Sequence, residues 1–177
     1  MSYEFTQSFP GTQLFVQEGE IEQPGVAIRG IAAAHTQGDP LVPEGGTDYI
    51  FIIDMGGLRI VHFGDIGQPA LTPEQAKAVG RVDVAITQFE NSYSEIDATN
   101  KKGFKLMEQL KPRLIVQTHS SLAAVNYAAT LWPVLYSKRP RVTLSAAELP
   151  KKTSLLLLGE EGAYYVESGV QARKVDW

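Results

Sequence analysis

Residues 48–67 read DYIFIIDMGGLRIVHFGDIG, and two apolar runs in this stretch are joined by a pair of glycines. The runs are Tyr49 to Met55 and Leu58 to Phe63, and both are rich in the β-branched and aromatic residues that strands prefer. Gly56-Gly57 between them accepts the positive φ angles of a tight two-residue turn. The pattern therefore predicts a β-hairpin whose second strand ends sharply at Gly64-Asp65-Ile66-Gly67.

Two further strands are predicted upstream of this hairpin, at Gln13 to Gln17 and at Val26 to Ala33. The second run consists of small and β-branched residues, as in a buried strand. Thr36 to Asp48 holds several glycines and prolines, which break both helix and strand, so a loop is predicted there.

Downstream of the hairpin, helices alternate with strands. Thr72 is suited to cap a helix, with Pro73 at the first position, Gln75 three residues after the cap and Gly80 at the end. Asp97 is predicted to cap a longer helix that ends near Leu110. The remaining predicted elements are a helix at Ser121 to Leu131 and strands at Val82 to Thr87, Leu114 to Gln117, Arg141 to Ser145, Ser154 to Leu158 and Ala163 to Glu167, the last two joined by a loop centred on Glu160-Glu161-Gly162.

This order of elements favours an α/β fold in which a mixed sheet has helices packed on it. The chain shows no internal repeat, no low-complexity segment and no linker rich in Pro and Gly. Residues 1–177 are therefore expected to form a single domain, and the length is sufficient for one hydrophobic core.

The composition narrows the classes of function. A net charge of −4 argues against a surface for nucleic acid or for an anionic membrane. The absence of cysteine excludes disulfides, thiolate metal sites and a cysteine nucleophile. No apolar run approaches the roughly 20 residues that cross a bilayer, and the N-terminal residues lack the pattern of a secretion signal. We expect a cytoplasmic protein.

Three histidines stand at or near the ends of predicted strands: His35, His62 and His119. Asp65 follows the same strand as His62. Taken singly, such a histidine is more often structural, and an aspartate after a strand and a glycine is more often a turn residue. Taken together they offer imidazole nitrogens and a carboxylate, which are the ligands that Zn²⁺, Mn²⁺ or Fe²⁺ takes from a chain without cysteine.

The same residues carry a resemblance to a known family. The matching segments are Ile31-Ala32-Ala33-Ala34-His35, the hairpin with Asp48-Tyr49-Ile50-Phe51-Ile52-Ile53 and Gly57-Leu58-Arg59-Ile60, Val61-His62-Phe63-Gly64-Asp65-Ile66-Gly67, Val82-Asp83-Val84-Ala85-Ile86, and Leu110-Lys111-Pro112-Arg113-Leu114-Ile115-Val116 leading to Thr118-His119. In this order they resemble the metallo-β-lactamase superfamily, closest to the branch of L-ascorbate-6-phosphate lactonase and its uncharacterised metal-dependent hydrolase relatives. The resemblance implies an αββα-type sandwich.

The resemblance also implies roles for individual residues. His35 would bind a first metal, His119 a second, and Asp65 would bridge the two and so be the catalytic carboxylate. His62 would steady the strand or a ligand without binding metal. The implied cofactor is a divalent metal, Zn²⁺ or Mn²⁺, which activates water to attack a lactone, ester, amide or phosphodiester.

Two segments depart from the family pattern. The family signature His-x-His-x-Asp-His lies upstream of the position of His35, and the 34 residues before His35 hold no histidine. We therefore expect the C-terminal part of the fold, truncated at the N-terminus, with too few ligands to bind metal strongly. The second departure, Gln88 to Ser94, lies where the lactonase has a Gly-rich turn and contains three candidate substrate-binding residues, Glu90, Asn91 and Tyr93.

A truncated sandwich would leave one apolar sheet face bare, which usually marks an interface. A homo-oligomer, with a two-fold dimer as the first expectation, would cover it. Three functions stay open at this point: a fragment of a metal-dependent hydrolase that is weak or inactive alone, a non-catalytic oligomeric or ligand-binding half-domain, and a mononuclear metal site formed across a chain interface. A serine hydrolase is disfavoured because no Gly-x-Ser-x-Gly elbow is present.

Overall fold

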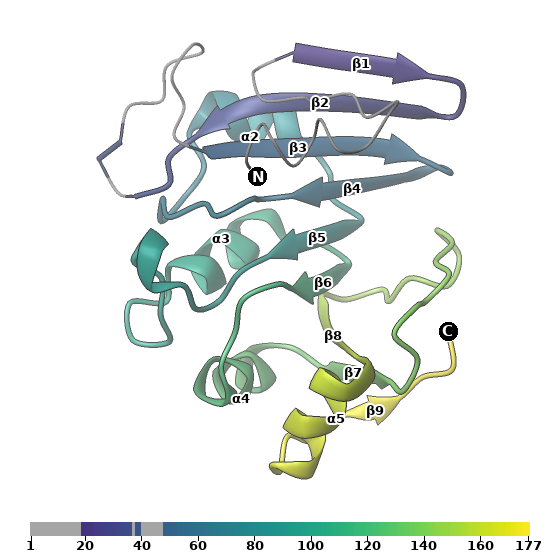
Figure 1. Ribbon diagram of the computed structural model, residues 1–177. Coiled ribbons are helices and arrows are strands. Elements are labelled where there is room, and N and C mark those ends of the chain that lie inside the picture. Colours follow the sequence, from purple (N-terminus) through teal and green to yellow (C-terminus); the bar gives the residue numbers. More distant parts are fainter. Residues whose placement is uncertain (1–18, 37, 40–47) are drawn as a thin grey trace, which may run out of the picture.

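A computed structural model describes residues 19–36, 38–39 and 48–177. The described residues form one mixed nine-stranded sheet in the order β1-β2-β3-β4-β5-β6-β8-β7-β9 (Figure 1). The strands are β1 (Gly19–Gln23), β2 (Val26–Ala33), β3 (Asp48–Met55), β4 (Leu58–His62), β5 (Val84–Thr87), β6 (Leu114–Gln117), β7 (Val134–Ser137), β8 (Ser154–Leu158) and β9 (Arg173–Lys174). The helices are α2 (Pro73–Val79), α3 (Lys102–Leu110), α4 (Leu122–Leu131) and α5 (Gly159–Glu167), with a 3₁₀ turn η1 at Ser92–Ser94. The predicted α/β class with a mixed sheet is confirmed.

The central hairpin is confirmed, and the whole first half of the sheet is antiparallel. β3 and β4 pair from Met55↔Leu58 to Phe51↔His62, and Gly56 and Gly57 have the positive φ angles that the turn requires. β1, which was not predicted, adds a second hairpin on β2. The predicted strand at Gln13 to Gln17 lies outside the described residues, as does most of the predicted loop after Thr36.

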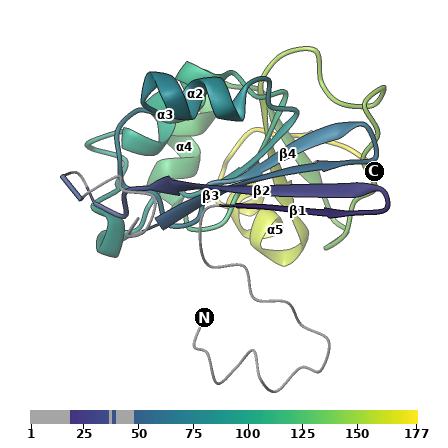
Figure 2. The same ribbon diagram turned by 90° about the horizontal axis from the view of Figure 1, so that it is seen from above.

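The second half of the sheet is parallel, from β4 through β5, β6, β8 and β7 to β9. Parallel strands need covered faces, and α2, α3 and α4 lie together on one of them (Figure 2). The helix α5 packs on β7 and β8. Because the sheet twists between its two ends, α5 is seen below β1–β4 in Figure 2, whereas α2, α3 and α4 are seen above them. One continuous cluster joins these helices to the sheet and includes Val61, Phe63, Met107, Val125 and Tyr165.

The caps of α2 and α4 follow the sequence signals. Thr72 Oγ1 accepts the N–H of Gln75 while Gln75 Oε1 accepts the N–H of Thr72, which is a complete capping box, and Gly80 ends α2. Ser121 caps α4 by accepting the N–H of Ala124. Asp97 does not cap the next helix as predicted: its Oδ1 accepts the N–H groups of Thr99 and Asn100 and closes a turn, and α3 begins only at Lys102.

Two predicted strands after residue 140 are wrong. Ala163 to Glu167 is the second half of α5, in which Tyr165 Oη donates to Glu161 one turn earlier. Its Tyr-Tyr-Val composition favours strands, but a helix lets Gly162 pack against the ring of Tyr136. Arg141 to Ser145 is irregular, although Val142 and Leu144 still pack on the sheet. The predicted strand Ser154 to Leu158 is confirmed as β8, whereas β7 and β9 were not predicted.

The sheet face opposite α2–α4 has its own apolar cluster, built around Val84, Leu114 and Leu156. Val142, Leu144 and Leu149 cover it from the irregular segment, together with Val175 and Trp177 near the C-terminus. This cover lies over the parallel half and does not include β1–β3, where Ile21, Ile28 and Ile53 are only partly buried. None of the described helices is both long and apolar enough for a transmembrane span.

Candidate functional site

Strand direction brings the sequence-predicted residues to one end of the sheet. β2 and β4 are antiparallel to β3, so both end where β3 begins, and Ala33 is paired with Asp48. β5 and β6 run parallel to β4 and end at the same side (Figure 1). The segments that follow β2, β4 and β6 carry His35, Asp65 and His119, and strand ends of this kind are a common place for sites.

A shallow depression of about 380 Å³ lies at this end of the sheet. All three predicted metal ligands line it, and so does His62. The full lining is His35, Asp48, His62, Gly64, Asp65, Thr118 and His119. The convergence expected from the sequence is therefore present.

Asp65 and His119 form the most exposed pair of the site. Nε2 of His119 lies 3.8 Å from Oδ1 of Asp65, and about half of each side chain is exposed (60% for His119, 48% for Asp65). The backbone beneath them is fixed, because the carbonyl of His119 accepts the N–H groups of Phe89 and Glu90. Both side chains can therefore reorient over a rigid frame.

His35 also lines the depression. Its Nε2 is 3.3 Å from Oγ of Ser94, a contact that the sequence did not predict. The preceding residue is held in place, since Ala34 donates to Gln68 Oε1 and its carbonyl accepts the N–H of Gly67. A Cβ on Gly67 would lie 2.0 Å from the carbonyl oxygen of His35, so only glycine permits this approach.

His62 points its Nδ1 at the turn rather than at open solvent. Nδ1 accepts the N–H of Gly64 at 3.0 Å, which requires the neutral ring with its proton on Nε2. Burial lowers the pKa of His62, and the negative charge of Asp65 partly opposes this shift. The contact is that of a side chain that supports the segment carrying Asp65.

Asp48 is the residue of this site that sequence reasoning missed. Its Oδ1 accepts the N–H of Asp65 at 3.1 Å, while its buried Oδ2 accepts no hydrogen bond from the described residues. Burial raises the pKa of Asp48 to about 7; the N–H groups of Asp65 and Tyr49 oppose the rise, and the Asp65 carboxylate adds to it. The available signal was a carboxylate at the start of a largely apolar strand.

A second pocket of about 680 Å³ adjoins the depression and shares Asp65 and His119 with it. Glu90, Asn91 and Tyr93 line this pocket and not the depression itself. Tyr93 is 82% exposed, whereas Asn91 is engaged locally, donating to Gln88 and accepting the N–H of Tyr93. Glu90 accepts a hydrogen bond from the hydroxyl of Ser121.

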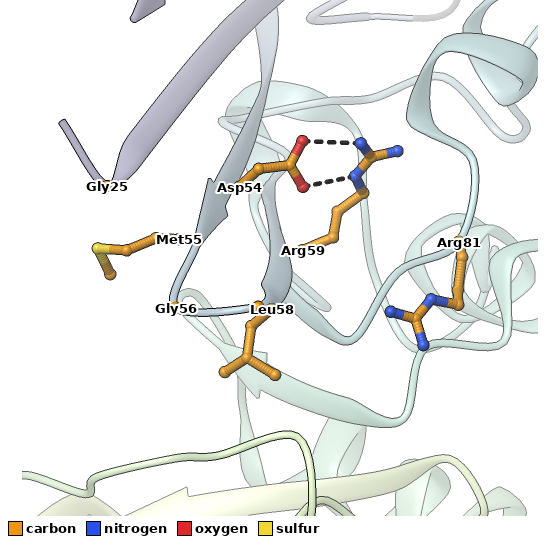
Figure 3. A pocket seen from close by; sticks show the side chains of 8 residues that line it. Gly25, Asp54, Met55, Gly56, Leu58, Arg59 and Arg81 are labelled. Atoms are coloured by element: carbon orange, nitrogen blue, oxygen red, sulfur yellow. Dashed lines mark hydrogen bonds and ion pairs between the residues drawn. The ribbon is translucent and has the colours of Figure 1, made fainter. Parts of the chain in front are cut away.

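A third pocket, of about 510 Å³, lies at the opposite end of β3 and β4, around the Gly56-Gly57 turn. Figure 3 shows its main feature, a bidentate pair of hydrogen bonds from the guanidinium of Arg59 to the carboxylate of Asp54. Its charged lining consists of Asp54, Arg59 and Arg81 and holds none of the three histidines. This pocket shares no lining residue with the depression around His35, Asp65 and His119.

The gathered residues fit a divalent ion in chemistry and location. Imidazole and carboxylate are suitable donors, and the buried Oδ2 of Asp48 accepts no hydrogen bond from the described residues. As placed, however, no three His, Asp or Glu side chains of the described residues could hold one ion together. Asp65 and His119 would have to turn inward, which their exposure permits.

Comparison with known proteins gives this geometry a family. The model of the beta-lactamase superfamily domain matches residues 7–119, a match that ends on His119. The chain belongs to the metallo-β-lactamase superfamily. The resemblance inferred from the sequence is thereby confirmed at the level of the superfamily.

Two solved structures show the same fold. A metallo-β-lactamase superfamily protein from Thermotoga maritima matches with a TM-score of 0.65 and 21% identity, over 83% of this chain and 72% of that one. The metallo-β-lactamase fold protein YhfI from Bacillus subtilis matches with a TM-score of 0.50 and 10% identity, over 88% of this chain and 58% of that one. No curated protein matches significantly.

Proposed function

We propose that this chain carries part of the metal centre of a hydrolase, with His35, Asp65 and His119 as the protein ligands. The observation that supports it is the gathering of these three side chains, from the ends of three different strands, around one depression. Zn²⁺ or Mn²⁺ is the ion that such donors suit. When bound, the metal supplies a water of lowered pKa as a nucleophile.

The roles of the chain's own residues follow from their positions. His35 and His119 both line the depression, and Asp65 lies 3.8 Å from His119, so Asp65 is the residue that we expect to be shared between two ions. Each ion would then have two ligands from this chain, one of them in common. A catalytic Zn²⁺ usually has three protein ligands, so this chain alone should bind metal weakly and hydrolyse its substrate slowly.

The adjoining pocket is the proposed place for the substrate. Its lining includes the carboxylates of Asp65, Glu90, Glu95 and Asp97 and contains no lysine or arginine among the described residues. Glu95 is paired with Lys102 at 3.5 Å, but in the metal-free protein the excess of carboxylates still disfavours anions, so we favour an uncharged lactone or ester over a phosphodiester or a phosphorylated substrate. We therefore retain lactone or ester hydrolysis from the resemblance to the lactonase branch, but not a phosphate-bearing substrate.

The partly buried isoleucines of β1–β3 support a second element of the proposal, a dimer. Ile21, Ile28, Ile53 and Ile60 are direct partners in a row that crosses four strands. A two-fold axis against this row would bury it and is the commonest arrangement of copies. The alternative function, a non-catalytic ligand-binding half-domain, is favoured because no three His, Asp or Glu side chains of the described residues are placed to hold one ion.

Metal content distinguishes these two functions. Purified protein is dialysed to equilibrium against a fixed concentration of Zn²⁺ or Mn²⁺, and the metal on each side of the membrane is measured by inductively coupled plasma mass spectrometry, so that weakly bound ions are retained. We expect about one ion per chain in the wild type and a loss of most of it in His119→Ala. Asp54→Ala, at the opposite end of β3, is the matched control and should retain the ion.

Absence of bound metal in the wild type would instead support the half-domain. Hydrolysis is then tested on an uncharged ester, p-nitrophenyl acetate, and on an anionic diester, bis(p-nitrophenyl) phosphate. Turnover of the ester that requires added metal and is lost in His119→Ala supports the proposed chemistry. Faster turnover of the anionic diester would contradict the proposed substrate preference.

A further inference from the structure

The turn that presents Asp65 is held by side chains from two neighbouring strands. Its consecutive N–H groups, of Gly64 and Asp65, donate to Nδ1 of His62 at 3.0 Å and to Oδ1 of Asp48 at 3.1 Å. Backbone N–H groups of a turn are otherwise left to water. Here both N–H groups are bound by side chains. The strands that carry these side chains are paired in the sheet, since His62 is the register partner of Phe51 and Asp48 that of Ala33.

Gly64 brings the carboxylate of Asp48 directly against this turn. Gly64 has φ +55°, and a Cβ built on it would lie 2.3 Å from Oδ1 of Asp48. A side chain at this position would therefore displace Asp48 from the N–H of Asp65. The close approach of the Asp48 side chain therefore requires glycine at position 64.

We propose that Asp48 is the positioning residue of the site, which through the N–H of Asp65 holds the backbone that carries the Asp65 carboxylate at the depression. This inference rests on the proposed metal-binding role of Asp65. In metal sites, the groups that hydrogen-bond the ligands fix their orientation, and losing one typically lowers metal affinity roughly 10- to 100-fold. Asp48 differs in that it binds the backbone N–H of the ligand residue Asp65 and not its carboxylate.

The side chain of Asp48 is suited to this role by its surroundings. It begins β3, lines the depression and is largely buried, so the position of Oδ1 is set by the strand and not by solvent. Its second oxygen, Oδ2, accepts no hydrogen bond from the described residues, so none of them pulls the carboxylate away from the N–H of Asp65. The hydrogen bond from the N–H of Asp65 to Oδ1 of Asp48 is therefore the contact that positions Asp65.

Three variants separate positioning from other roles. Asp48→Ala removes the acceptor, whereas Asp48→Asn keeps an Oδ1 acceptor and removes the charge. Asp54→Ala is the matched control, because it removes a carboxylate from the other end of the same strand, where it pairs with Arg59 (Figure 3). Folding of each variant is checked by the dispersion of its ¹H–¹⁵N spectrum.

The first readout is amide hydrogen exchange at Asp65 in metal-free protein, measured by NMR. We expect exchange at Asp65 to be at least roughly tenfold faster in Asp48→Ala, and to stay near the wild-type rate in Asp48→Asn and Asp54→Ala, because an N–H exchanges when its hydrogen bond opens. Equal rates in Asp48→Ala and the wild type would overturn the proposal. So would an Asp48→Asn variant that exchanges as fast as Asp48→Ala.

The second readout is the affinity for Zn²⁺ by isothermal titration calorimetry. Asp48→Ala should bind roughly 10- to 100-fold more weakly than the wild type, with Asp48→Asn closer to the wild type than to Asp48→Ala. An unchanged affinity in Asp48→Ala would refute the link between Asp48 and the ligand. Wild-type protein that binds no Zn²⁺ would sink the proposed function, while the exchange rates would still decide whether Asp48 holds Asp65.

Discussion

Nε2 of His119 lies 3.8 Å from Oδ1 of Asp65, although the two residues follow different strands, β6 and β4, that are separated in the sheet by β5. The segment after β5 contacts His119 directly, because the N–H groups of Phe89 and Glu90 donate to the carbonyl of His119. The pair is therefore a product of the parallel order of three strands and not of sequence proximity.

Asp65 should matter more to metal binding than either histidine, because it is the ligand that two ions would share. Asp65→Ala is expected to lose all measurable bound metal, whereas His119→Ala should retain a weakly held ion at the His35 side. Metal titration followed by mass spectrometry of the native protein compares the two variants. A greater loss in His119→Ala than in Asp65→Ala would show that Asp65 is not shared.

Asp48 should make stability depend on pH. Its pKa is raised from 3.8 to about 7 in the folded protein, so the folded state binds more protons than the unfolded state between these values. Stability is therefore lost as pH rises from about 4 through 7, by at most a few kcal/mol. Urea unfolding of metal-free wild type and Asp48→Asn should show a stability difference that shifts in favour of the variant from pH 4 to pH 8. A difference that is constant with pH would contradict the raised pKa.

Gly64→Ala should be more destabilising than a comparable change at another turn. Gly64 combines φ +55° with a contact of 2.3 Å between the added Cβ and Asp48, whereas Gly57 has φ +76° and no atom within 4 Å of such a Cβ. We expect a loss of about 1–2 kcal/mol for Gly57→Ala from backbone strain alone and about 2–5 kcal/mol for Gly64→Ala. Chemical denaturation of both variants measures the difference, and equal losses would argue against the close contact.

The row of isoleucines on β1–β4 should determine the oligomeric state. Ile53 is at the centre of this row, opposite both Ile28 and Ile60. If the row is the dimer interface, Ile53→Lys should convert a dimer to a monomer, because an unpaired charge in an apolar interface is costly. Size-exclusion chromatography with light scattering at micromolar concentration gives the mass; a monomeric wild type removes this part of the proposal. Val142→Lys, on the covered part of the same face, is the control and should change stability more than mass.

Most elements between residues 48 and 131 could be predicted because local signals agree with the tertiary structure there. The Gly56-Gly57 turn, the capping box at Thr72 and the short apolar strand at Leu114 each specify their element through nearest neighbours. After residue 131 the agreement is partial, since only the strand Ser154 to Leu158 is confirmed. Arg141 to Ser145 alternates like a strand, yet the segment that follows it is anchored by the side chain of Arg113, which donates to the carbonyls of Ala146, Leu149 and Pro150. A long-range anchor of this kind leaves no local trace.

The same reasoning explains what was found and missed at the site. His35, Asp65 and His119 could be chosen because imidazole and carboxylate groups after strands are chemically distinctive. Asp48 and Ser94 could not, because their roles depend on contacts with Asp65 and His35 across the sheet. Residues that support a ligand are ordinary in sequence and become visible only through the atoms that they touch.

The two hydrogen bonds from Phe89 and Glu90 to the carbonyl of His119 have a mechanical consequence. Glu90 is part of the wall of the larger pocket, and His119 belongs to both hollows. A ligand that pushes this wall outward therefore pulls on the backbone of the histidine. Occupancy of the larger hollow and the geometry around the smaller one are thus linked through this peptide oxygen, in addition to the shared residues Asp65 and His119.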